Sequence, residues 1–385
     1  MPGRGRLPTV SQIAERHRDL PPELGERLLA SQNGDPKALL AGRPDLLETF
    51  DGAMAAWNAG RPSAVAIVGP RGSGLSSLIT ALRDRTLDEI ENGESDEERV
   101  VSKLLSHHSR LRSEAQMLSF VSKGLELEHP ASGLEELVAQ LVTGPRRIVF
   151  VEDLQDMLLR VVDGTRAIEA FLGLIARTAN RVLWVVSCRR QTWRILEHQF
   201  GVSRIVPTCL AAELPDRVPI DTAVERWNGE LGHPIRFLRD DPPRRRRPPS
   251  QEELAGDFLT DLWRVAGGNL MAARLYWLDA LEWDDEAREI GIRPLHDPDL
   301  STVRTLPRDQ LFSLLSILQH GGLKPAEHAE IYLTDPTTSR RVLEALVQVG
   351  LADPLGGGAR EGCYDINPAA DRQLIETLEN LNLLY

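Results

Sequence analysis

Long apolar runs are missing from this sequence. No stretch approaches the ~20 consecutive apolar residues that a membrane-spanning helix needs, so we expect no membrane insertion. The opening residues, MPGRGRLPTV, carry arginines with no hydrophobic stretch behind them, and we therefore expect no secretory signal. Cysteine is scarce as well: Cys188, Cys209 and Cys363 are widely spaced, which argues against a disulfide framework or a zinc site. These absences predict a cytoplasmic protein.

Positively charged residues are also fewer than negatively charged ones. The net charge of −12 over 385 residues disfavours broad, non-specific binding to nucleic acid, because such binding depends on clustered Lys and Arg that neutralise phosphates. The basic residues are almost all arginine, a bias common in bacteria with GC-rich genomes. A chain of this length suits two or three domains, and its apolar residues suffice for sizeable cores.

Short apolar runs alternate with helical patterns in the first half of the chain. The runs expected to form strands lie within 64–68, 146–153, 179–187 and 203–208, and a further strand near 99–105 is left open. Strands that alternate with helices predict an α/β fold with a parallel, doubly wound sheet. From Leu214 to about Asp284 we expect helices in place of strands.

A glycine-rich stretch follows the first of these runs. GPRGSGLSS, residues 69–77, matches the phosphate-loop consensus G-x-x-x-x-G-K-[ST] except at Leu75, where lysine is expected. The glycines let backbone N–H groups turn inward around phosphates, and the N-terminus of the next helix favours anionic charge. Leucine keeps this backbone cradle but removes the cation that stabilises the transferring phosphoryl group. We therefore expect hydrolysis to suffer far more than the fold.

Polar side chains around the loop supply the rest of the expected site. The Ser76 hydroxyl would bind Mg²⁺, whereas Arg71 starts from a different point than the missing lysine and is not expected to replace it. The residues expected to contact nucleotide in the loop are Gly69, Arg71, Gly72, Ser73, Gly74, Leu75, Ser76 and Ser77.

The strand IVFV ends in two acids. Glu152 stands where a Mg²⁺-associated aspartate is usual, and Asp153 stands where a water-activating glutamate is usual. The swap changes the reach of each carboxylate by one methylene, and positioning errors near 1 Å cost on the order of a hundredfold in rate. The pair is therefore compatible with Mg²⁺ held by Ser76 and Glu152 and is poor evidence for fast turnover.

With these motifs, the chain resembles the AAA+ ATPases over roughly residues 42–385, especially the initiator-like and STAND-like branches with a C-terminal winged helix. AGRPDLLETF resembles the Gly-Arg motif of that family, which implies Gly42 and Arg43 near the adenine. GPRGSGLSS resembles a degenerate Walker A motif and IVFVEDLQ a Walker B strand, and Ser187 stands at the polar sensor position. These resemblances imply Glu152, Asp153 and Ser187 as the catalytic groups.

The lid motif of the family departs from its pattern in this chain. GGNLMAAR resembles it, but the usual sensor arginine maps to Met271, and Arg274, one turn later, is the candidate substitute. Arg204 stands about where an arginine finger would be, and an ordinary surface arginine is the favoured reading.

The resemblance also implies the domain organisation. We expect an N-terminal arm, a P-loop AAA+-like α/β domain, a helical lid with an Arg/Pro-rich loop, and a winged-helix domain with three helices, a hairpin and a final helix. The expected ranges are 1–40 for the arm, 41–210 for the α/β domain, 211–300 for the lid with its loop at 239–250, and 301–385 for the winged helix.

The departures from the family pattern occur at positions that serve hydrolysis, whereas the motifs that indicate the fold are present. The resemblance therefore implies a catalytically impaired, AAA+-like ATP-binding protein that serves as a regulatory or scaffolding subunit, with a protein partner or in a homo- or hetero-oligomer. Its cofactor would be ATP or ADP with Mg²⁺, and an empty site is left open. The alternative is an active ATP-dependent, DNA-associated switch that uses Arg340 and Arg341 of the winged helix, which nearby acids such as Asp335 and Glu344 disfavour.

Overall fold

The computed structural model describes residues 7–16, 43–92, 101–106, 109–212, 217–239, 249–356 and 361–384. The expected adenine contact Gly42, most of the N-terminal arm and most of the 239–250 loop lie outside these ranges. In the described part of the chain, no helix combines the length and apolar character that crossing a bilayer requires.

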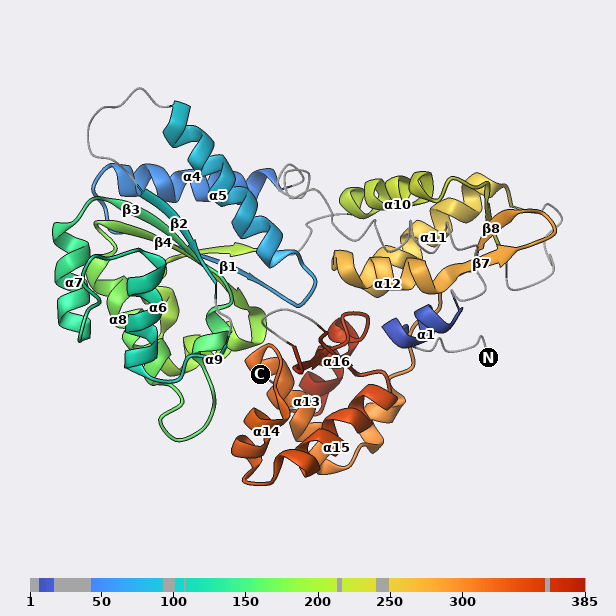
Figure 1. Ribbon diagram of the computed structural model, residues 1–385. Helices are drawn as coiled ribbons and strands as arrows, with labels where there is room; N and C mark the ends of the chain where they lie inside the picture. Colours follow the sequence, from blue (N-terminus) through green and yellow to red (C-terminus); the bar gives the residue numbers. More distant parts are fainter. Residues whose placement is uncertain are drawn as a thin grey trace.

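A parallel sheet forms the centre of the first half of the chain (Figure 1). Its strands run in the order β2-β3-β4-β1-β5, and every neighbouring pair is parallel. This confirms the predicted α/β fold, and β2 is the strand left open near 99–105. The bounds are β1 Ala64–Gly69, β2 Val101–Leu105, β3 Arg147–Val151, β4 Val182–Arg189 and β5 Thr208–Ala211.

The bounds expected for the last strand are wrong. Val202–Arg204 forms a short 3-10 helix instead, and β5 starts only at Thr208. The left-handed Gly201 (φ 60°) ends the preceding helix and turns the chain, and Pro207 has no N–H to give to a strand ladder.

Helices cover both faces of the sheet, so the strand side chains on each face are buried. Val65 and Ile67 face the layer of α4 and α5, whereas Ala64, Ala66 and Val68 face the layer of α6 to α9. This alternation follows from the two-residue period of a strand. The helices are α4 Pro44–Asn58, α5 Leu75–Asn92, α6 Glu114–Gly124, α7 Leu134–Thr143, α8 Arg166–Thr178 and α9 Arg190–Phe200.

The lid contains a small sheet as well as helices. Its elements are α10 Val218–Leu231, β6 Ile235–Phe237, α11 Gln251–Ala266, α12 Leu270–Ala280, β7 Leu281–Asp284 and β8 Glu289–Ile292. The strands form a three-stranded sheet in the order β6-β8-β7, and because β6 and β7 lie between Leu214 and Asp284, the expectation of helices alone there is wrong. Strands of three or four residues are too short for their alternation to stand out from helical periodicity.

The C-terminal part is a winged helix, as predicted. Three helices precede an antiparallel β9–β10 hairpin, and a final helix follows it. The elements are α13 Arg308–His320, α14 Pro325–Tyr332, α15 Pro336–Gln348, β9 Ala352–Pro354, β10 Tyr364–Ile366 and α16 Asp371–Asn380.

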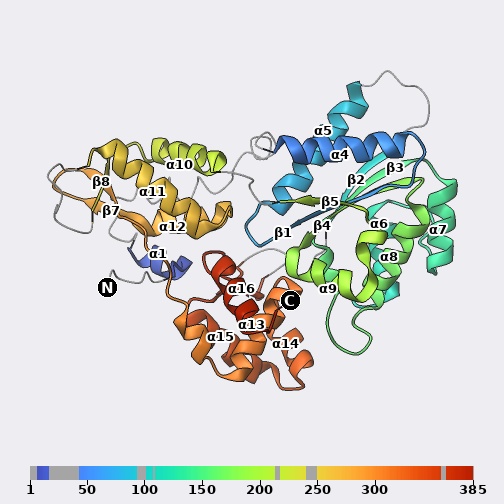
Figure 2. The same ribbon diagram turned by 180° about the vertical axis from the view of Figure 1, so that it is seen from behind.

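The lid and the winged helix share one hydrophobic core. Residues of α10 to α12 and of α13, α15 and α16 belong to the same buried cluster, which Leu7 and Ile13 join from the N-terminal segment. The short helix α1 (Val10–Arg16) contains Ile13, and Figures 1 and 2 both show it between the lid and the winged helix. The Asn367 side-chain amide donates to the Pro8 carbonyl (2.9 Å), which fixes this segment.

Candidate functional site

The phosphate loop connects β1 to α5 and has the backbone its glycines predict. Gly72 and Gly74 adopt φ values of 82° and 85°, a region that residues with a Cβ rarely occupy. The Ser73 hydroxyl donates to the Pro70 carbonyl (2.8 Å), which closes the loop on itself. A Cβ at Gly69 would lie 2.5 Å from the Ser73 Oγ, so the loop leaves no room for a side chain there.

Arg43 supports the loop through hydrogen bonds to backbone carbonyls. Its guanidinium is buried and donates to the Ser73 carbonyl (3.3 Å) and to the Ala212 carbonyl (2.9 Å), just beyond β5. Burial lowers the pKa of Arg43 to about 10, which leaves it charged at neutral pH. The side chain expected near the adenine therefore holds two backbone carbonyls.

A cavity of about 290 Å³ opens over the loop. Leu75 is the first residue of α5 and is only 7% exposed, because its side chain packs in the core between α4, α5 and the sheet. The lysine position thus contributes to the core and carries no cation. The residues that line the cavity are Pro70, Gly72, Gly74, Leu75, Ser76, Ser77, Asp153 and Arg189.

The predicted acidic and sensor residues come together at this edge of the sheet. Glu152 hydrogen-bonds the hydroxyls of Ser76 and Ser106, and burial, followed by the neighbouring Asp153 charge, raises the pKa of Glu152. The backbone N–H of Asp153 donates to the Ser187 Oγ (3.0 Å). A hydroxyl and a carboxylate side by side are the hard oxygen donors that Mg²⁺ prefers, so Ser76 and Glu152 fit the ion they were expected to hold.

The conformation of Asp153 is restrained at both its backbone and its carboxylate. Its backbone is left-handed (φ 57°), and the Gln155 side-chain amide donates to its Oδ1 (2.7 Å). Gln155 is fully buried, and its Oε1 accepts from the Arg189 N–H (3.1 Å). This glutamine, which sequence reasoning missed, therefore connects the acid after β3 with the end of β4.

The lid contacts the loop through backbone and amide groups. Asn269 caps α12: its Oδ1 accepts from the N–H groups of Met271 and Ala272, and its Nδ2 donates to the Arg71 carbonyl (2.5 Å). The Met271 N–H lies 3.4 Å from the Gly72 carbonyl oxygen. A Cβ at Gly72 would lie 2.5 Å from the Met271 Cβ, so the loop and the lid are in close contact.

Arg274 does not reach this contact. Its guanidinium lies over the ring of Trp227 (5.3 Å to the centroid) and near that of Trp277 (6.0 Å). Burial lowers the pKa of Arg274. The lid therefore places an apolar Met271 at the loop, and the suggested substitute arginine packs on lid tryptophans.

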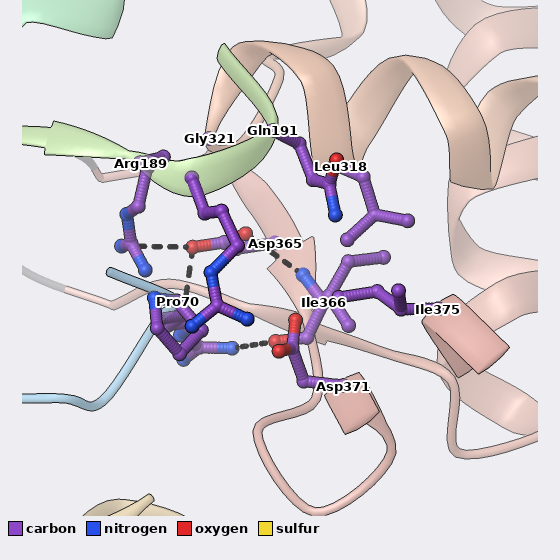
Figure 3. Close-up of a pocket in the computed structure, with 11 residues that line it drawn as sticks. Pro70, Arg189, Gln191, Leu318, Gly321, Asp365, Ile366, Asp371 and Ile375 are labelled. Atoms are coloured by element: carbon purple, nitrogen blue, oxygen red, sulfur yellow. Dashed lines mark hydrogen bonds and ion pairs between the residues drawn. The ribbon is translucent and has the colours of Figure 1, made fainter. Parts of the chain in front are cut away.

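The winged helix contacts the same loop through arginine–aspartate pairs, which Figure 3 shows in part. Arg71 pairs with Asp353 on β9 (3.3 Å) and with Asp365 on β10 (3.5 Å), and it also donates to the Ile366 carbonyl. Arg189 pairs with the same Asp365 (3.4 Å). The Arg71 guanidinium therefore binds the β9–β10 hairpin, and Arg71 is not among the residues that line the loop cavity.

A second buried contact joins the α/β domain to the winged helix. Arg110 donates to the carbonyls of Gln155 and Leu158 (both 2.7 Å) and of Gly322 (3.0 Å), and it pairs with Glu327 on α14 (2.9 Å). Nothing in the local sequence around Arg110 indicates this role, because its partners lie up to 217 positions away.

The remaining candidates lie on the surface. Arg204 is exposed in its 3-10 helix, and Arg340 and Arg341 are exposed in the first half of α15. The structure places none of these three side chains in the lining of the loop cavity.

Comparisons with known proteins give matches among solved structures. No protein-family model and no curated protein sequence matches the chain. One match is Drosophila ORC bound to DNA, at 13% identity and a TM-score of 0.46 over 96% of this chain and 94% of that chain. A second is the Aeropyrum pernix ORC1 protein in complex with DNA, at 15% identity and a TM-score of 0.43 over 89% and 94%. A third is the Aeropyrum pernix ORC2 protein in ADPNP–ADP complexes, at 14% identity and a TM-score of 0.42 over 88% and 93%.

The chain's own elements define its fold. A parallel sheet with the order β2-β3-β4-β1-β5 carries a phosphate loop after β1, and a lid and a winged helix follow it along the chain. The protein therefore has a P-loop α/β fold with a C-terminal winged helix.

Proposed function

We propose that this protein is an AAA+-like nucleotide-binding subunit that regulates or scaffolds a multiprotein assembly and hydrolyses ATP weakly or not at all. The observation that carries the proposal is the contrast within one loop. The backbone cradle and the Ser76–Glu152 pair are formed, whereas Leu75 at the lysine position is buried in the core.

This contrast separates binding from turnover. Backbone N–H groups and a helix N-terminus hold phosphates in the ground state and need no side-chain cation. The transferring phosphoryl group needs positive charge and an aligned nucleophile, and their loss reduces the rate by orders of magnitude. Asp153, the candidate water-activating acid, accepts a hydrogen bond from Gln155, which restrains its carboxylate.

The contacts of the loop favour a regulatory role. Its backbone carbonyls at Arg71 and Gly72 contact the lid, and its Arg71 side chain binds the winged helix. A ligand that changes the loop therefore changes contacts with both other parts of the chain. ATP or ADP with Mg²⁺ would act in this way, with Ser76 and Glu152 holding the ion, and the altered surfaces would be read by a protein partner or by another copy in an oligomer.

The test combines binding with turnover. Purified protein is titrated with labelled ATP and ADP, with and without Mg²⁺, beside Leu75→Lys, and phosphate release is measured in parallel. We expect binding by the natural chain with little or no release, and tighter binding by the lysine variant. Hydrolysis at the rate of an ordinary AAA+ ATPase, abolished by Glu152→Gln with Asp153→Asn, would refute the proposal, as would the absence of nucleotide binding.

A second candidate is an ATP-dependent, DNA-associated switch. The observation in its favour is that Arg340 and Arg341 are both exposed on α15, the third helix of the winged helix. Salt-dependent binding to duplex DNA that Arg340→Ala with Arg341→Ala abolishes would support it. No measurable affinity at low salt would rule it out.

A further inference from the structure

The N-terminal segment of the chain, residues 7–16, packs between the lid and the winged helix (Figures 1 and 2). Its two apolar anchors, Leu7 and Ile13, are each 6% exposed. Helix α1 packs against α12 of the lid, and the residues before it lie against the winged helix at Gly350 and Asn367. We call the surface formed by α12, Gly350 and Asn367 the docking site.

The winged helix orients Asn367 without help from the segment. The Asn367 Oδ1 accepts from the Ala369 N–H (2.9 Å), and the Asn367 N–H donates to the Leu351 carbonyl (3.0 Å). Its Nδ2 donates to the Gly350 carbonyl (2.9 Å) and, with its second hydrogen, to the Pro8 carbonyl (2.9 Å). A fully buried side chain that its own domain orients therefore presents a donor to the backbone of the segment. Such main-chain contacts give affinity for an extended peptide, and apolar anchors give specificity.

Gly350 lets the segment approach closely. It adopts a φ of 78°, and an added Cβ would lie 3.2 Å from the Thr9 Cγ2 and 3.7 Å from the Leu7 Cβ. The segment turns at Thr9: the Gln12 N–H donates to the Thr9 Oγ1 (3.3 Å), and the Ile13 N–H donates to the Thr9 carbonyl (3.0 Å). The docking site therefore fits the pattern Leu-Pro-Thr followed by one helical turn that buries an isoleucine.

The lid and the winged helix are also joined directly. The Tyr276 hydroxyl of α12 donates to the Ala369 carbonyl (2.8 Å), and the Gln373 Nε2 of α16 donates to the Val265 carbonyl of α11 (3.1 Å). The apolar core between these two parts extends well beyond the two anchors of the segment. We therefore expect the docking site to keep its shape when the segment leaves, so the segment is a ligand tethered to its own receptor.

We propose that the docking site is a peptide-binding site and that, in an assembly of this protein, it takes residues 7–16 of a second copy. Every copy carries the ligand that the site already fits. Residues 17–42 link the segment to α4, and covalent geometry lets a link of this length span as much as roughly 90 Å, enough to reach a neighbouring copy. A reciprocal exchange fills both docking sites, loses no contact and closes a twofold dimer. The exchange needs no nucleotide and goes beyond the proposed function.

A peptide test uses the full chain with its docking site vacated. Leu7→Asp with Ile13→Asp places charges on both anchors, and binding of the labelled, acetylated peptide LPTVSQIAER is followed by fluorescence anisotropy. We expect the peptide to bind this variant and to bind the natural chain about tenfold more weakly, because the tethered segment competes at a local concentration on the order of millimolar.

Variants of the peptide test the contacts without any risk to the fold of the protein. The Leu7→Ala peptide should bind about tenfold more weakly, because it buries less apolar area. The Val10→Ala peptide is the matched control and should bind as the natural peptide does, because Val10 is 55% exposed.

Sedimentation of the natural chain tests the second copy as the occupant. We expect a dimer that grows with protein concentration and that excess peptide converts to monomer, whereas Leu7→Asp with Ile13→Asp stays monomeric. A Thr9→Cys chain mixed with a Gly350→Cys chain should form a disulfide-linked pair, because a Cβ at position 350 lies 3.2 Å from the Thr9 Cγ2. The natural chain in place of Thr9→Cys is the control for the natural cysteines.

The outcomes separate the docking site from its occupant. No peptide binding by the vacated chain, or equal binding by the vacated and natural chains, overturns the docking site. A natural chain that stays monomeric, or a dimer that excess peptide does not dissociate, overturns the second copy as its occupant. If the double aspartate variant does not fold, the response of the natural chain to peptide still carries the test. No nucleotide enters these measurements, so their failure and the failure of the proposed function are distinct results.

Discussion

Asp371 gives the sharpest test of the electrostatics between the loop and the winged helix. It is the first residue of α16, is 8% exposed, and lies in the pocket formed with Pro70, Arg189 and Asp365. Burial raises the pKa of Asp371 to about 6, against the opposing pull of Arg189, with a further rise from Asp365. The folded protein therefore holds this proton more tightly than the unfolded chain does.

The sign of the pH dependence follows from that difference. An aspartate in the unfolded chain has a pKa near 3.8, so the stabilisation from the protonated carboxyl is fully present below that pH. It is lost as the pH rises through about 6, the value in the folded state. At pH 7 to 8 the ionised Asp371 costs about 3 kcal/mol at most, from the conversion of a pKa difference to free energy.

Asp371→Asn should therefore stabilise the protein at pH 7.5 by about 1 to 3 kcal/mol, after a small loss of favourable charge at the helix N-terminus. The assay is urea unfolding of both proteins at pH 4.5, 6 and 7.5. The gain should shrink steadily as the pH falls.

Asp45→Asn is the matched control, because Asp45 also lies in the first turn of a helix but is exposed. It should lower stability slightly, by about 0.3 to 1 kcal/mol, at pH 6 and 7.5 alike. Loss of stability in Asp371→Asn at pH 7.5, or a gain that does not change with pH, would refute the reasoning.

Three further predictions concern the contacts among the three parts of the chain. Gly72→Ala should lower the stability by about 1 to 3 kcal/mol and loosen the start of α12, because φ at this position is 82° and the new Cβ would lie 2.5 Å from the Met271 Cβ. Thermal unfolding and hydrogen exchange measure the two effects. Gly256→Ala is the control and should not destabilise the protein, because nothing lies within 4 Å of the added Cβ. Arg110→Met should cost about 3 to 5 kcal/mol by leaving Glu327 buried without its cation, and calorimetry should show the winged helix melting apart from the α/β domain; one transition at the original temperature would contradict this. His320 is fully buried, its Nε2 accepts from the Arg160 N–H (3.0 Å), and burial lowers its pKa to about 3, so the stability it contributes is present above pH 6.5 and is lost as the pH falls toward 3. His320→Gln should weaken that acid dependence in urea titrations, and an unchanged slope between pH 6.5 and 4 would count against it.

The sequence predicts the sheet well because its signal is local. Each central strand is a continuous apolar run, and each burial pattern reflects two covered faces. The strands of the lid escape prediction because pairs such as Trp283 with Ile290 come from short segments whose partners decide their conformation. The same holds for β5, whose register is set by β1 rather than by its own pattern.

The sequence predicts which residue types form the candidate site better than it predicts where their side chains point. Ser76 of the loop and Glu152 after β3, which the sequence predicts as one site, lie together in the structure. The loop motif does not indicate where Arg71 points, because its partner Asp353 lies 282 positions away along the chain and Asp365 lies farther still. Asn269 had a local signal, an N-cap residue after two glycines, but its bond to the Arg71 carbonyl depends on how the lid packs.

These contacts explain how a phosphate loop can keep its shape without its catalytic cation. A Cβ at Gly69 would collide with the Ser73 Oγ and lie 2.8 Å from the Ala212 Cβ, and one at Gly72 would collide with the lid. The Arg71 side chain supplies ion pairs that hold the winged helix. Each of these constraints comes from packing between parts of the chain and would hold with no nucleotide turnover. Lysine at position 75 is different, because its main contribution is to the charge of the transferring phosphate. A loop that serves as the junction of three structural units can therefore lose that lysine at little cost to the fold, and Leu75 gains apolar burial in its place.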